Sequence, residues 1–311
     1  MHNSQSTKSG ELNVVTGAFG YTGKYITRQL LAMGKQVKTL TGHPERENPF
    51  GDRVSVAPFS FNDPEQLSES LRGASTLFNT YWIRFAYGKT TFETAIENTK
   101  TLIKAAQQAS LRKIVHISIT NPSEQSRLAY FRGKALLERA VIDSGLSYAI
   151  IRPAVIFGDE DILINNIAWL LRHFPVFVVP GKGDYRLQPV FVEDLAELAV
   201  RLSAQTDNIV VDAVGPEVFA FDELVRLIAD KVQNRARIIH LPPRLAQLLS
   251  VVIGYLVHDV VLTSDEVAGL MDNLLISDGP PTGGTRLRDW LSEHAEIVGK
   301  RYACELDRHY W

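Results

Sequence analysis

Short apolar runs alternate with longer amphipathic stretches over the first half of the chain. The apolar runs, which predict β-strands, are residues 12–16, 36–40, 54–58, 76–79, 114–119 and 148–151. Apolar positions with helical spacing predict helices between them, near residues 23–33, 65–71, 91–108 and 130–143. Strands that alternate with helices are typical of βαβ units around a parallel sheet. The pattern therefore predicts an α/β fold with a Rossmann-like, doubly wound parallel sheet.

The regular alternation ends near Pro153. Beyond it, less regular helical stretches are separated by a Gly-rich turn at residues 181–184 and a Pro-rich turn at residues 279–284. We therefore expect a Rossmann core at residues 12–153 and a smaller, mixed C-terminal α/β lobe at residues 154–311 that is interleaved with the core.

The composition is that of an ordinary globular protein, with 45% hydrophobic and 22% charged residues. The 33 Lys and Arg residues are balanced by 35 Asp and Glu residues, which gives a formal net charge of -2. A global excess of positive charge, which would favour nucleic acid or anionic lipid, is absent. We expect no nucleic-acid partner.

Several features bear on the cellular compartment. Residues 1–11 are polar and lack an apolar segment, so they are expected to be a disordered tail and not a secretory signal. Cys304 is the only cysteine, which excludes an internal disulfide and fits a reducing compartment. The most apolar window, residues 245–262, is interrupted by polar residues and is too short in its apolar runs to span a bilayer. We expect a cytoplasmic protein with no integral membrane span, in which this window forms a buried or partner-facing helix.

A glycine-rich loop follows the first predicted strand and leads into a helical pattern. Its glycines, Gly17, Gly20 and Gly23, would let the backbone approach a pyrophosphate without a blocking side chain. The N-terminus of the next helix would offer free N–H groups and a positive dipole end to that anion. The residues of this loop that we expect to bind a dinucleotide are Gly17, Phe19, Gly20, Tyr21, Thr22 and Gly23.

The Gly-x-x-Gly-x-x-Gly spacing resembles that of the extended and atypical short-chain dehydrogenases/reductases, and the resemblance covers most of the chain. Asn98 resembles the asparagine on the central helix of that family. Residues 152–158 resemble its post-strand segment, and residues 188–196 resemble the later segment that closes over the site. The chain is similar to two branches of the family, the nitrogen-metabolite-repression-regulator-like proteins and the nucleotide-binding accessory subunit of respiratory complex I.

The tip of the second predicted strand bears on the choice between NAD and NADP. An acidic residue there would bind the NAD ribose, whereas a cation tolerates the 2′-phosphate of NADP. No acid stands at this tip, but Gly42 occupies the position where NADP-binding relatives often carry arginine. Thr41, His43 and Arg46 could surround a phosphate, although residues 43–44 could also be only a turn. We expect NADP, with NAD as the alternative.

The family resemblance implies further cofactor contacts at Asn79, Thr80, Lys134 and Pro153. The adenine contacts are less well indicated, because Ser60 stands where family members commonly have aspartate.

Tyr130 and Lys134 have the Tyr-x-x-x-Lys spacing of the family's catalytic pair and would lie on one face of a helix. A nearby ammonium favours the phenolate, so we expect Lys134 to lower the pKa of Tyr130 toward neutrality. The same spacing also occurs on many surface helices. A hydroxyl at the end of the preceding strand should position the substrate oxygen; Thr120 is favoured by the resemblance, and Ser118 is the alternative. Either hydroxyl could instead satisfy backbone groups at the strand end.

Three aromatic residues, Tyr81, Trp82 and Phe85, could line a substrate pocket or simply pack together. Arg84 is an unusual charged residue within this aromatic segment. The eight histidines show no metal-ligand spacing, so no metal site is expected. No Gly-x-Ser-x-Gly motif occurs, and Cys304 is expected to be a packed or free thiol.

These patterns predict an NAD(P)H-dependent oxidoreductase that transfers hydride to or from a small carbonyl or alcohol substrate. The alternative is a non-catalytic NADP(H)-binding regulatory or accessory protein. An epimerase-like or dehydratase activity on nucleotide sugars is less favoured, because the C-terminal lobe contains no clear sugar-nucleotide motif. If the helix at residues 245–257 exposes its apolar face, a homodimer or another docked partner would follow.

Overall fold

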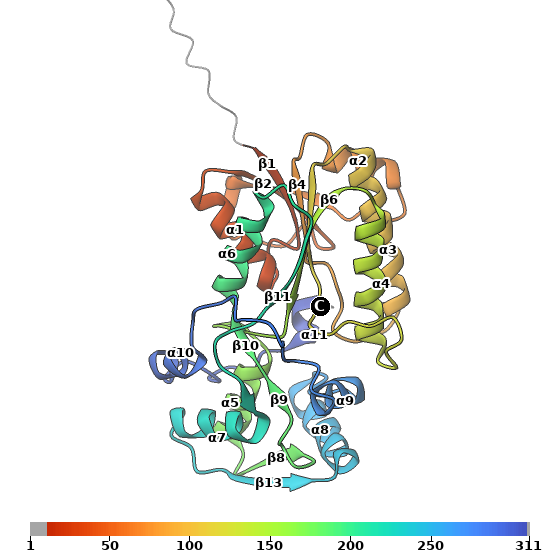
Figure 1. Ribbon diagram of the computed structural model, residues 1–311. Helices are drawn as coiled ribbons and strands as arrows, with labels where there is room; N and C mark the ends of the chain where they lie inside the picture. Colours follow the sequence, from red (N-terminus) through yellow and green to blue (C-terminus); the bar gives the residue numbers. More distant parts are fainter. Residues whose placement is uncertain (1–10, 310–311) are drawn as a thin grey trace, which may run out of the picture.

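The structure is a computed structural model that describes residues 11–309, and its upper half is a seven-stranded parallel sheet (Figure 1). In spatial order the strands are β11 (Ile209–Ala213), β6 (Ser147–Pro153), β5 (Lys113–Ile117), β4 (Thr76–Asn79), β1 (Leu12–Thr16), β2 (Gln36–Thr41) and β3 (Val54–Pro58). The order reverses between β1 and β4, as it does in doubly wound sheets. The predicted fold class is confirmed.

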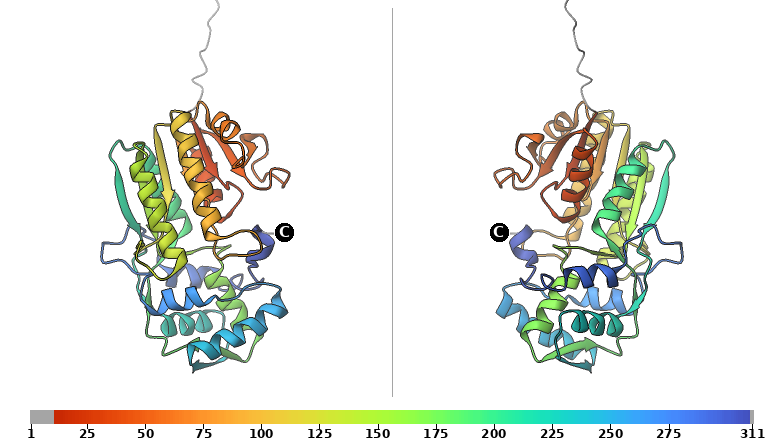
Figure 2. Two further views of the ribbon diagram at one scale, coloured as in Figure 1. Left: turned by 90° about the vertical axis from the view of Figure 1, so that its right-hand side faces the viewer. Right: turned by 90° about the vertical axis from the view of Figure 1, so that its left-hand side faces the viewer.

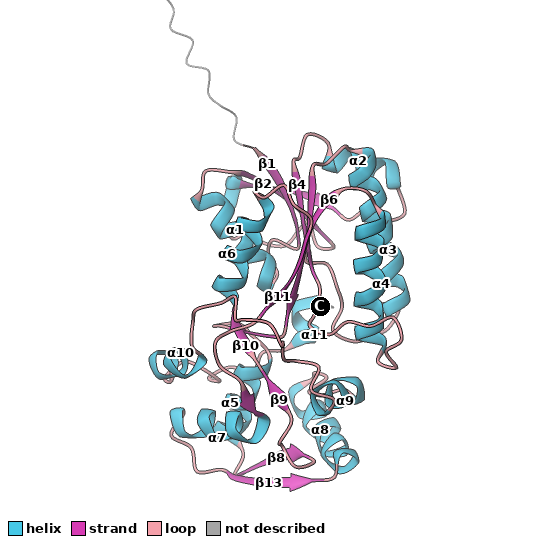
Figure 3. Ribbon diagram, viewed as in Figure 1, coloured by secondary structure: helices cyan, strands magenta, loops and turns pink. Residues whose placement is uncertain are grey.

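Helices cover both faces of this sheet (Figure 3). One face carries α1 (Tyr21–Ala32) and α6 (Val192–Ser203), and the other carries α2 (Pro64–Leu71), α3 (Phe92–Gln108) and α4 (Ala129–Asp143). The central strands are therefore buried on both sides, which explains why they read as continuous apolar runs and not as alternating patterns.

The predicted strand at residues 114–119 differs in its bounds from β5, which begins at Lys113 and ends at Ile117. Two further backbone N–H groups continue alongside β6: Ser118 donates to the carbonyl of Ile151 at 2.7 Å, and Thr120 donates to that of Pro153 at 3.0 Å. The segment thus stays extended for a few residues beyond the strand.

The lower half is a smaller lobe of short strands and helices. Its strands are β7 (Val155–Phe157), β8 (Val176–Pro180), β9 (Arg186–Leu187), β10 (Pro189–Phe191), β12 (Phe219–Ala220) and β13 (Arg237–Leu241). They form three two-stranded sheets within the described residues. Its helices are α5 (Leu163–His173), α7 (Phe221–Lys231), α8 (Pro243–Val257), α9 (Ser264–Met271), α10 (Leu287–His294) and α11 (Glu305–His309). In the upper half, a short 3₁₀ helix, η1 (Gly51–Arg53), precedes β3.

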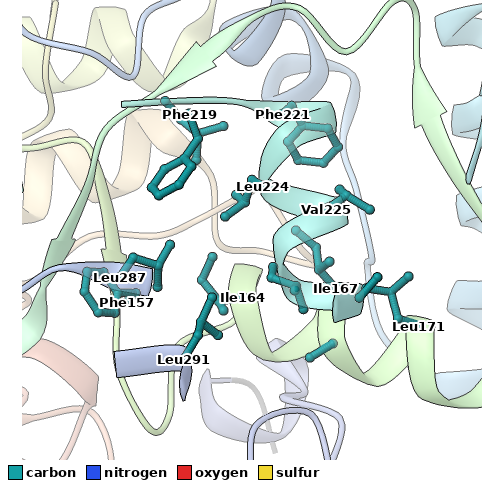
Figure 4. Packing of buried hydrophobic residues seen from close by; sticks show 14 of the residues in the cluster. Phe157, Ile164, Ile167, Leu171, Phe219, Phe221, Leu224, Val225, Leu287 and Leu291 are labelled. Carbon is teal, nitrogen blue, oxygen red and sulfur yellow. The ribbon is translucent and has the colours of Figure 1, made fainter. Parts of the chain in front are cut away.

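The lower lobe has its own apolar core (Figure 4). Ile164, Ile167 and Leu171 lie one helical turn apart on α5 and face Leu224 and Val225 on α7. The ring of Phe157 lies 5.6 Å from that of Trp290, which ties α10 to the same core.

The chain passes between the two halves more than once. After α5, β8, β9 and β10 it returns to the sheet to form α6 and β11, and then enters the lower lobe again at β12. Helix α11 lies at mid-height between the sheet and the lower lobe (Figure 2).

The predicted disordered tail lies outside the described residues, apart from Glu11. That residue is held in place, because Lys35 donates to its carboxylate at 2.7 Å and Ser75 also donates to it. These hydrogen bonds lower the pKa of Glu11 to about 2. Including Glu11 in the tail was therefore wrong.

Within residues 11–309, no helix combines the length and the apolar character that crossing a membrane requires. No cluster of side chains suited to a metal ion occurs in the same range.

Candidate functional site

A cavity of about 1530 Å³ lies between the carboxyl ends of the sheet strands and the lower lobe. Its walls come from both halves of the molecule: the loop between β1 and α1, the tips of β2 and β4, and helices α4, α5, α8, α9 and α11. In open α/β sheets this end, at the point where the strand order reverses, is where ligands bind.

The glycine-rich loop forms one end of the cavity and depends on its glycines in different ways. Gly17 has φ +64°, a left-handed conformation that favours glycine. A Cβ at Gly23 would lie 2.2 Å from the carbonyl oxygen of Gly17, so this position admits no side chain without moving the backbone. Gly20 precedes α1, whose N-terminus has no side-chain cap and no acidic residue in its first turn. The first turn of α1 therefore offers backbone N–H groups and a positive helix end, which suit a phosphate.

Most of the residues predicted to bind the cofactor line this cavity. They are Gly17, Phe19, Gly20, Tyr21, Thr22, Gly23, Thr41, His43, Arg46, Thr80, Lys134 and Pro153.

Asn79 is the exception among the predicted cofactor contacts. Its side chain is buried within the sheet, where it accepts from Thr16 at 3.2 Å and contacts Nδ1 of His116 at 3.0 Å. Asn79 therefore braces the strands beneath the cavity, and the structure does not bring it to the cavity wall.

The tip of β2 combines basic and acidic groups. The backbone N–H of His43 donates to the hydroxyl of Thr41 at 3.1 Å, which closes a tight turn at the end of the strand. Arg46 donates to the carbonyl of Arg308 at 2.7 Å, which ties this loop to α11. Glu47 lines the same part of the cavity, so the region is not uniformly positive.

An aromatic cluster beside the β2 tip was not predicted. The rings of Phe59 and Phe61 are stacked at 4.8 Å, and Tyr81 lies 5.2 Å from Phe59. All three line the cavity, and Asn98 donates to the Tyr81 hydroxyl at 2.9 Å. Asn98 thus positions an aromatic wall. The apolar run at 54–61 offered a signal for these rings, but no sequence spacing connects Phe59 and Phe61 with Tyr81.

Tyr130 reaches the cavity from the first turn of α4. Its ring lies edge-on to Trp82, with centroids 5.8 Å apart, and beside Phe92 at 6.2 Å. Its hydroxyl forms no hydrogen bond with any described residue. Burial raises the pKa of Tyr130 above its usual value, and the carboxylates of Glu266 and Glu305 raise it further.

Lys134 is buried one turn further along α4. Its ammonium donates to the carbonyl of Ile117 at 2.8 Å and lies 5.0 Å from the centre of the Trp82 ring. Burial lowers the pKa of Lys134 to about 7. The expectation that Lys134 lowers the pKa of Tyr130 is wrong for this arrangement, because desolvation removes much of the charge that would act on the phenol.

The two candidate hydroxyls have different surroundings. Ser118 lines the cavity, but its hydroxyl donates to the buried carboxylate of Glu138, which Arg152 also grips with two hydrogen bonds. Glu138 and Arg152 were not identified in this role from the sequence.

Thr120 does not line the cavity. Its hydroxyl donates to the carbonyl of Leu274 at 2.7 Å, a partner 154 residues away in sequence. The structure therefore does not bring Thr120 into the site, and it engages the hydroxyl with a distant loop.

Arg84 joins the cavity wall to the lower lobe. Its guanidinium pairs with Glu266 on α9 and donates to the carbonyl of Val261 at 3.1 Å. Glu266 is also part of the capping box that begins α9. Arg84 thus fixes α9 beside Tyr130. Trp82 and Phe85, for which the sequence left pocket lining and simple packing open, both line the cavity.

The part of the cavity farthest from the glycine-rich loop is mainly apolar. It lies between α5 and α8, and its lining includes Leu163, Ile167, Leu170, Phe177, Leu249 and Ile253. A compound that fills it must offer apolar surface, because few of these side chains can form hydrogen bonds.

Comparison with protein families gives a match that covers most of the upper half of the molecule and reaches the start of α5. Residues 17–166, which contain the glycine-rich loop, Tyr130 and Lys134, match the family model described as NAD(P)H-binding.

Two curated relatives show how far the similarity extends. NADH dehydrogenase (ubiquinone) 1 alpha subcomplex subunit 9 of Arabidopsis thaliana is 25% identical over 293 residues, which cover 88% of this chain and 73% of the relative. Photosystem II assembly factor Ycf39 of Cyanidium caldarium is 23% identical over 247 residues, which cover 78% of each chain.

Among solved structures, the NADPH-dependent quinone oxidoreductase QOR2 of Escherichia coli aligns with a TM-score of 0.70 at 20% identity. The alignment covers 90% of this chain and 99% of QOR2. The likeness shows a common fold that includes the lower lobe.

Proposed function

We propose that this chain, whose residues 17–166 match the NAD(P)H-binding family model, is an oxidoreductase of the atypical short-chain dehydrogenase/reductase type that reduces a carbonyl group at the expense of NADPH. The observation that carries this proposal is the position of Tyr130. Its hydroxyl has no hydrogen-bond partner among the described residues and lies in the same cavity as the glycine-rich loop.

In the proposed reaction, bound NADPH would supply a hydride to the carbonyl carbon, leaving an alcohol and NADP⁺. Tyr130 donates its hydroxyl proton to the carbonyl oxygen as the electron pair of the C=O bond moves onto that oxygen. The raised pKa of Tyr130 keeps the hydroxyl protonated at neutral pH, so the resting residue holds the proton that the reduction requires.

The remaining residues hold the reactants. Lys134 anchors the base of the site through Ile117 and Trp82, and the rings of Trp82 and Phe92 exclude water around the phenol. Ser118 is the hydroxyl that could turn toward the substrate oxygen, provided that it leaves Glu138. The partner we propose is thus a small molecule, bound next to the cofactor.

NADP(H) is the proposed cofactor, because the tip of β2 carries His43 and Arg46 and has no carboxylate at the strand end. Arg46→Ala should weaken NADPH binding by roughly tenfold, about the value of one charge-assisted hydrogen bond, and leave NADH binding nearly unchanged. Calorimetric titration of both cofactors tests this. Equal losses for NADH and NADPH would instead assign Arg46 to the structure of the loop and would contradict its role in selecting NADPH.

The cytoplasm is the compartment that we propose, on the basis of the single cysteine. The Arabidopsis relative is named as a mitochondrial protein, so fractionation of cells that produce the full chain is the direct test.

A second function, binding of NADPH without turnover, is favoured by the hydrogen bonds around the site. The groups that would assist Tyr130 already have protein partners: Lys134 donates to Ile117, and the hydroxyl of Ser118 donates to Glu138. In this alternative, the bound cofactor would stabilise the two halves of the molecule against each other.

The test is a calorimetric titration with NADPH and NADH, followed by a panel of aldehydes, ketones and quinones monitored through nicotinamide absorbance. We expect oxidation of NADPH by at least one compound, and we expect Tyr130→Phe to lose at least about a hundredfold in turnover while it binds NADPH normally. Tyr148→Phe, a change on β6 outside the cavity, is the matched control. Tight binding without turnover across the panel would favour the second function.

A further inference from the structure

Helix α8 exposes one of its sides to solvent, and that side is almost entirely apolar. Its exposed large side chains include Tyr255, of which 80% is accessible, Leu256 at 66% and Leu248 at 64%. Monomeric proteins rarely expose so many large apolar side chains next to one another. The exposed apolar residues of the helix are Leu245, Leu248, Leu249, Val251, Val252, Tyr255 and Leu256.

The orientation of α8 is fixed by its other side. Ala246, Ser250 and Gly254 are spaced four residues apart and are all buried. A Cβ at Gly254 would lie 2.6 Å from the carbonyl oxygen of Asp259, so the helix is held close to the chain that follows it. The helix cannot rotate its apolar side inward without losing this close approach.

The segment that forms α8 and the strand before it is rich in basic residues. Residues 231–258 contain Lys231, Arg235, Arg237 and Arg244 and no Asp or Glu. None of these four forms a salt bridge with a described residue. Asp222, on the neighbouring α7, is already paired with Arg226 and His240. The net charge of -2 for the whole chain thus conceals a local excess of positive charge.

The basic and apolar groups lie at one end of the molecule. Helix α8 and strand β13, which carries Arg237, both lie at the end of the lower lobe opposite the seven-stranded sheet (Figures 1 and 2). An apolar helix face next to basic side chains is typical of proteins that lie on anionic membranes.

We propose that this end of the lower lobe docks on an anionic phospholipid surface. The apolar side of α8 enters the boundary between head groups and acyl chains, and Arg235, Arg237 and Arg244 contact the phosphates and carboxylates of the lipids. Charge distinguishes this partner from a second copy of the chain, because two such ends brought together would place like charges opposite each other. The proposal stands independently of whether the site is catalytic.

The inner side of the same helix connects this surface with the cavity. Ser250 and Ile253 line the apolar part of the cavity between α5 and α8, and Leu249, at the edge of the exposed side, also reaches it. Docking would therefore place that apolar part next to the bilayer, where an apolar compound is concentrated.

The test is flotation of the full chain with vesicles of phosphatidylcholine, with and without phosphatidylserine. We expect binding to the anionic vesicles to be at least about tenfold stronger than to neutral ones and to weaken as salt is raised. A Leu248→Gln, Val252→Gln double variant should lose most of this binding, and Arg235→Gln, Arg237→Gln should lose its dependence on phosphatidylserine.

Two controls distinguish a loss of docking from misfolding and from a general loss of exposed apolar surface. Val218→Gln changes another exposed apolar residue, 47% accessible, outside α8, and should bind vesicles as the unmodified chain does. NADPH titration of each variant shows whether the upper half is intact.

The proposal fails if the double variant floats as well as the unmodified chain, or if neither binds anionic vesicles. It also fails if light scattering shows a dimer that the double variant converts to a monomer, because a second copy would then cover α8.

Discussion

Gly23 is the position in the glycine-rich loop where an added Cβ atom would clash with the backbone and not with a flexible side chain. The atom in contact would be the backbone carbonyl oxygen of Gly17, only 2.2 Å from a Cβ at Gly23. Overpacking of this kind typically costs about 1–3 kcal/mol.

We expect Gly23→Ala to weaken NADPH binding by roughly tenfold to a hundredfold, because the loop must open to admit the methyl group. Calorimetric titration measures this. Gly284→Ala is the control, since nothing lies within 4 Å of a Cβ there. Equal NADPH affinities for the two variants would show that the loop does not hold the phosphate.

Lys134 should make stability depend on pH in a direction opposite to that of a lysine whose pKa is raised by an ion pair. Burial lowers its pKa in the folded protein from 10.5 to about 7. Between those values the unfolded chain holds a proton that the folded protein has released, so stability rises with pH. Below about pH 7 both states are protonated, and the full cost of the buried charge remains.

We expect the unfolding free energy of the unmodified protein, relative to Lys134→Met, to increase from pH 7 to pH 10. Urea denaturation of both proteins at several pH values measures this difference and cancels the groups that they share. A difference that is constant with pH would mean that Lys134 keeps its proton in the folded state.

For single residues, the sequence indicated which side chains face the cavity, but it did not indicate their hydrogen-bond partners. The glycine spacing located the loop because glycine has a specific backbone role there. The partners of the Thr120 hydroxyl and of the Asn79 amide, Leu274 and His116, could not be predicted because they come from distant segments. A residue type shows what a side chain can bind, whereas the fold decides what it does bind.

At the scale of elements, α5 begins with a buried acid. Asp161 accepts the backbone N–H of Ile164 at 2.6 Å and the side-chain amide of Asn165 at 2.9 Å. Burial raises the pKa of Asp161 to about 7, so the carboxyl group is held at the helix start at a cost when it is charged.

We expect Asp161→Ala to destabilise the protein by about 1–2 kcal/mol, the usual value of a lost helix cap. Asp161→Asn keeps an acceptor for the Ile164 N–H and should cost less. In the unmodified protein, the unfolding free energy should fall as the pH rises from 4 to 7, because the folded carboxyl group still holds its proton there while the unfolded one has released it. Asp161→Asn should remove this fall. Urea denaturation at pH 5 and pH 8 distinguishes the two variants, and equal losses would exclude a capping role.

Elements of the upper half could be located from sequence because strands buried on both faces give uninterrupted apolar runs, and the helices between them are long enough to show a period. The strand predicted from residue 54 to residue 58 coincides with β3. In the lower lobe the strands β9 and β12 are two residues long, which is too short for any periodicity to appear. Their pairing depends on contacts between segments far apart in the chain.

On the scale of the whole molecule, the cavity has walls from both halves, so a ligand in it contacts both. Asp259 accepts from the backbone N–H groups of Glu305 and Leu306, which holds α11 across the middle of the molecule. Arg308 donates to the carbonyl of Glu160 at 2.6 Å and ties α11 to the segment before α5.

We expect NADPH at a hundredfold excess over its dissociation constant to raise the unfolding free energy by about 2.7 kcal/mol. Differential scanning calorimetry should show one transition that moves upward by several degrees, because the two halves share the cavity. Two separate transitions, of which only one moves, would mean that the cofactor contacts the upper half alone.

The return of the chain to the sheet has a consequence for synthesis on the ribosome. The glycine-rich loop is made first, but β6 has no neighbour on its outer side until β11, residues 209–213, has been translated. Until α6 is made, α1 also lacks the helix that packs beside it. The nascent chain therefore carries an open sheet edge through the synthesis of much of the lower lobe, an interval in which such edges are prone to pair wrongly. Slow translation between residues 154 and 213 would lengthen that interval, and a chaperone that binds extended apolar segments would be most useful then.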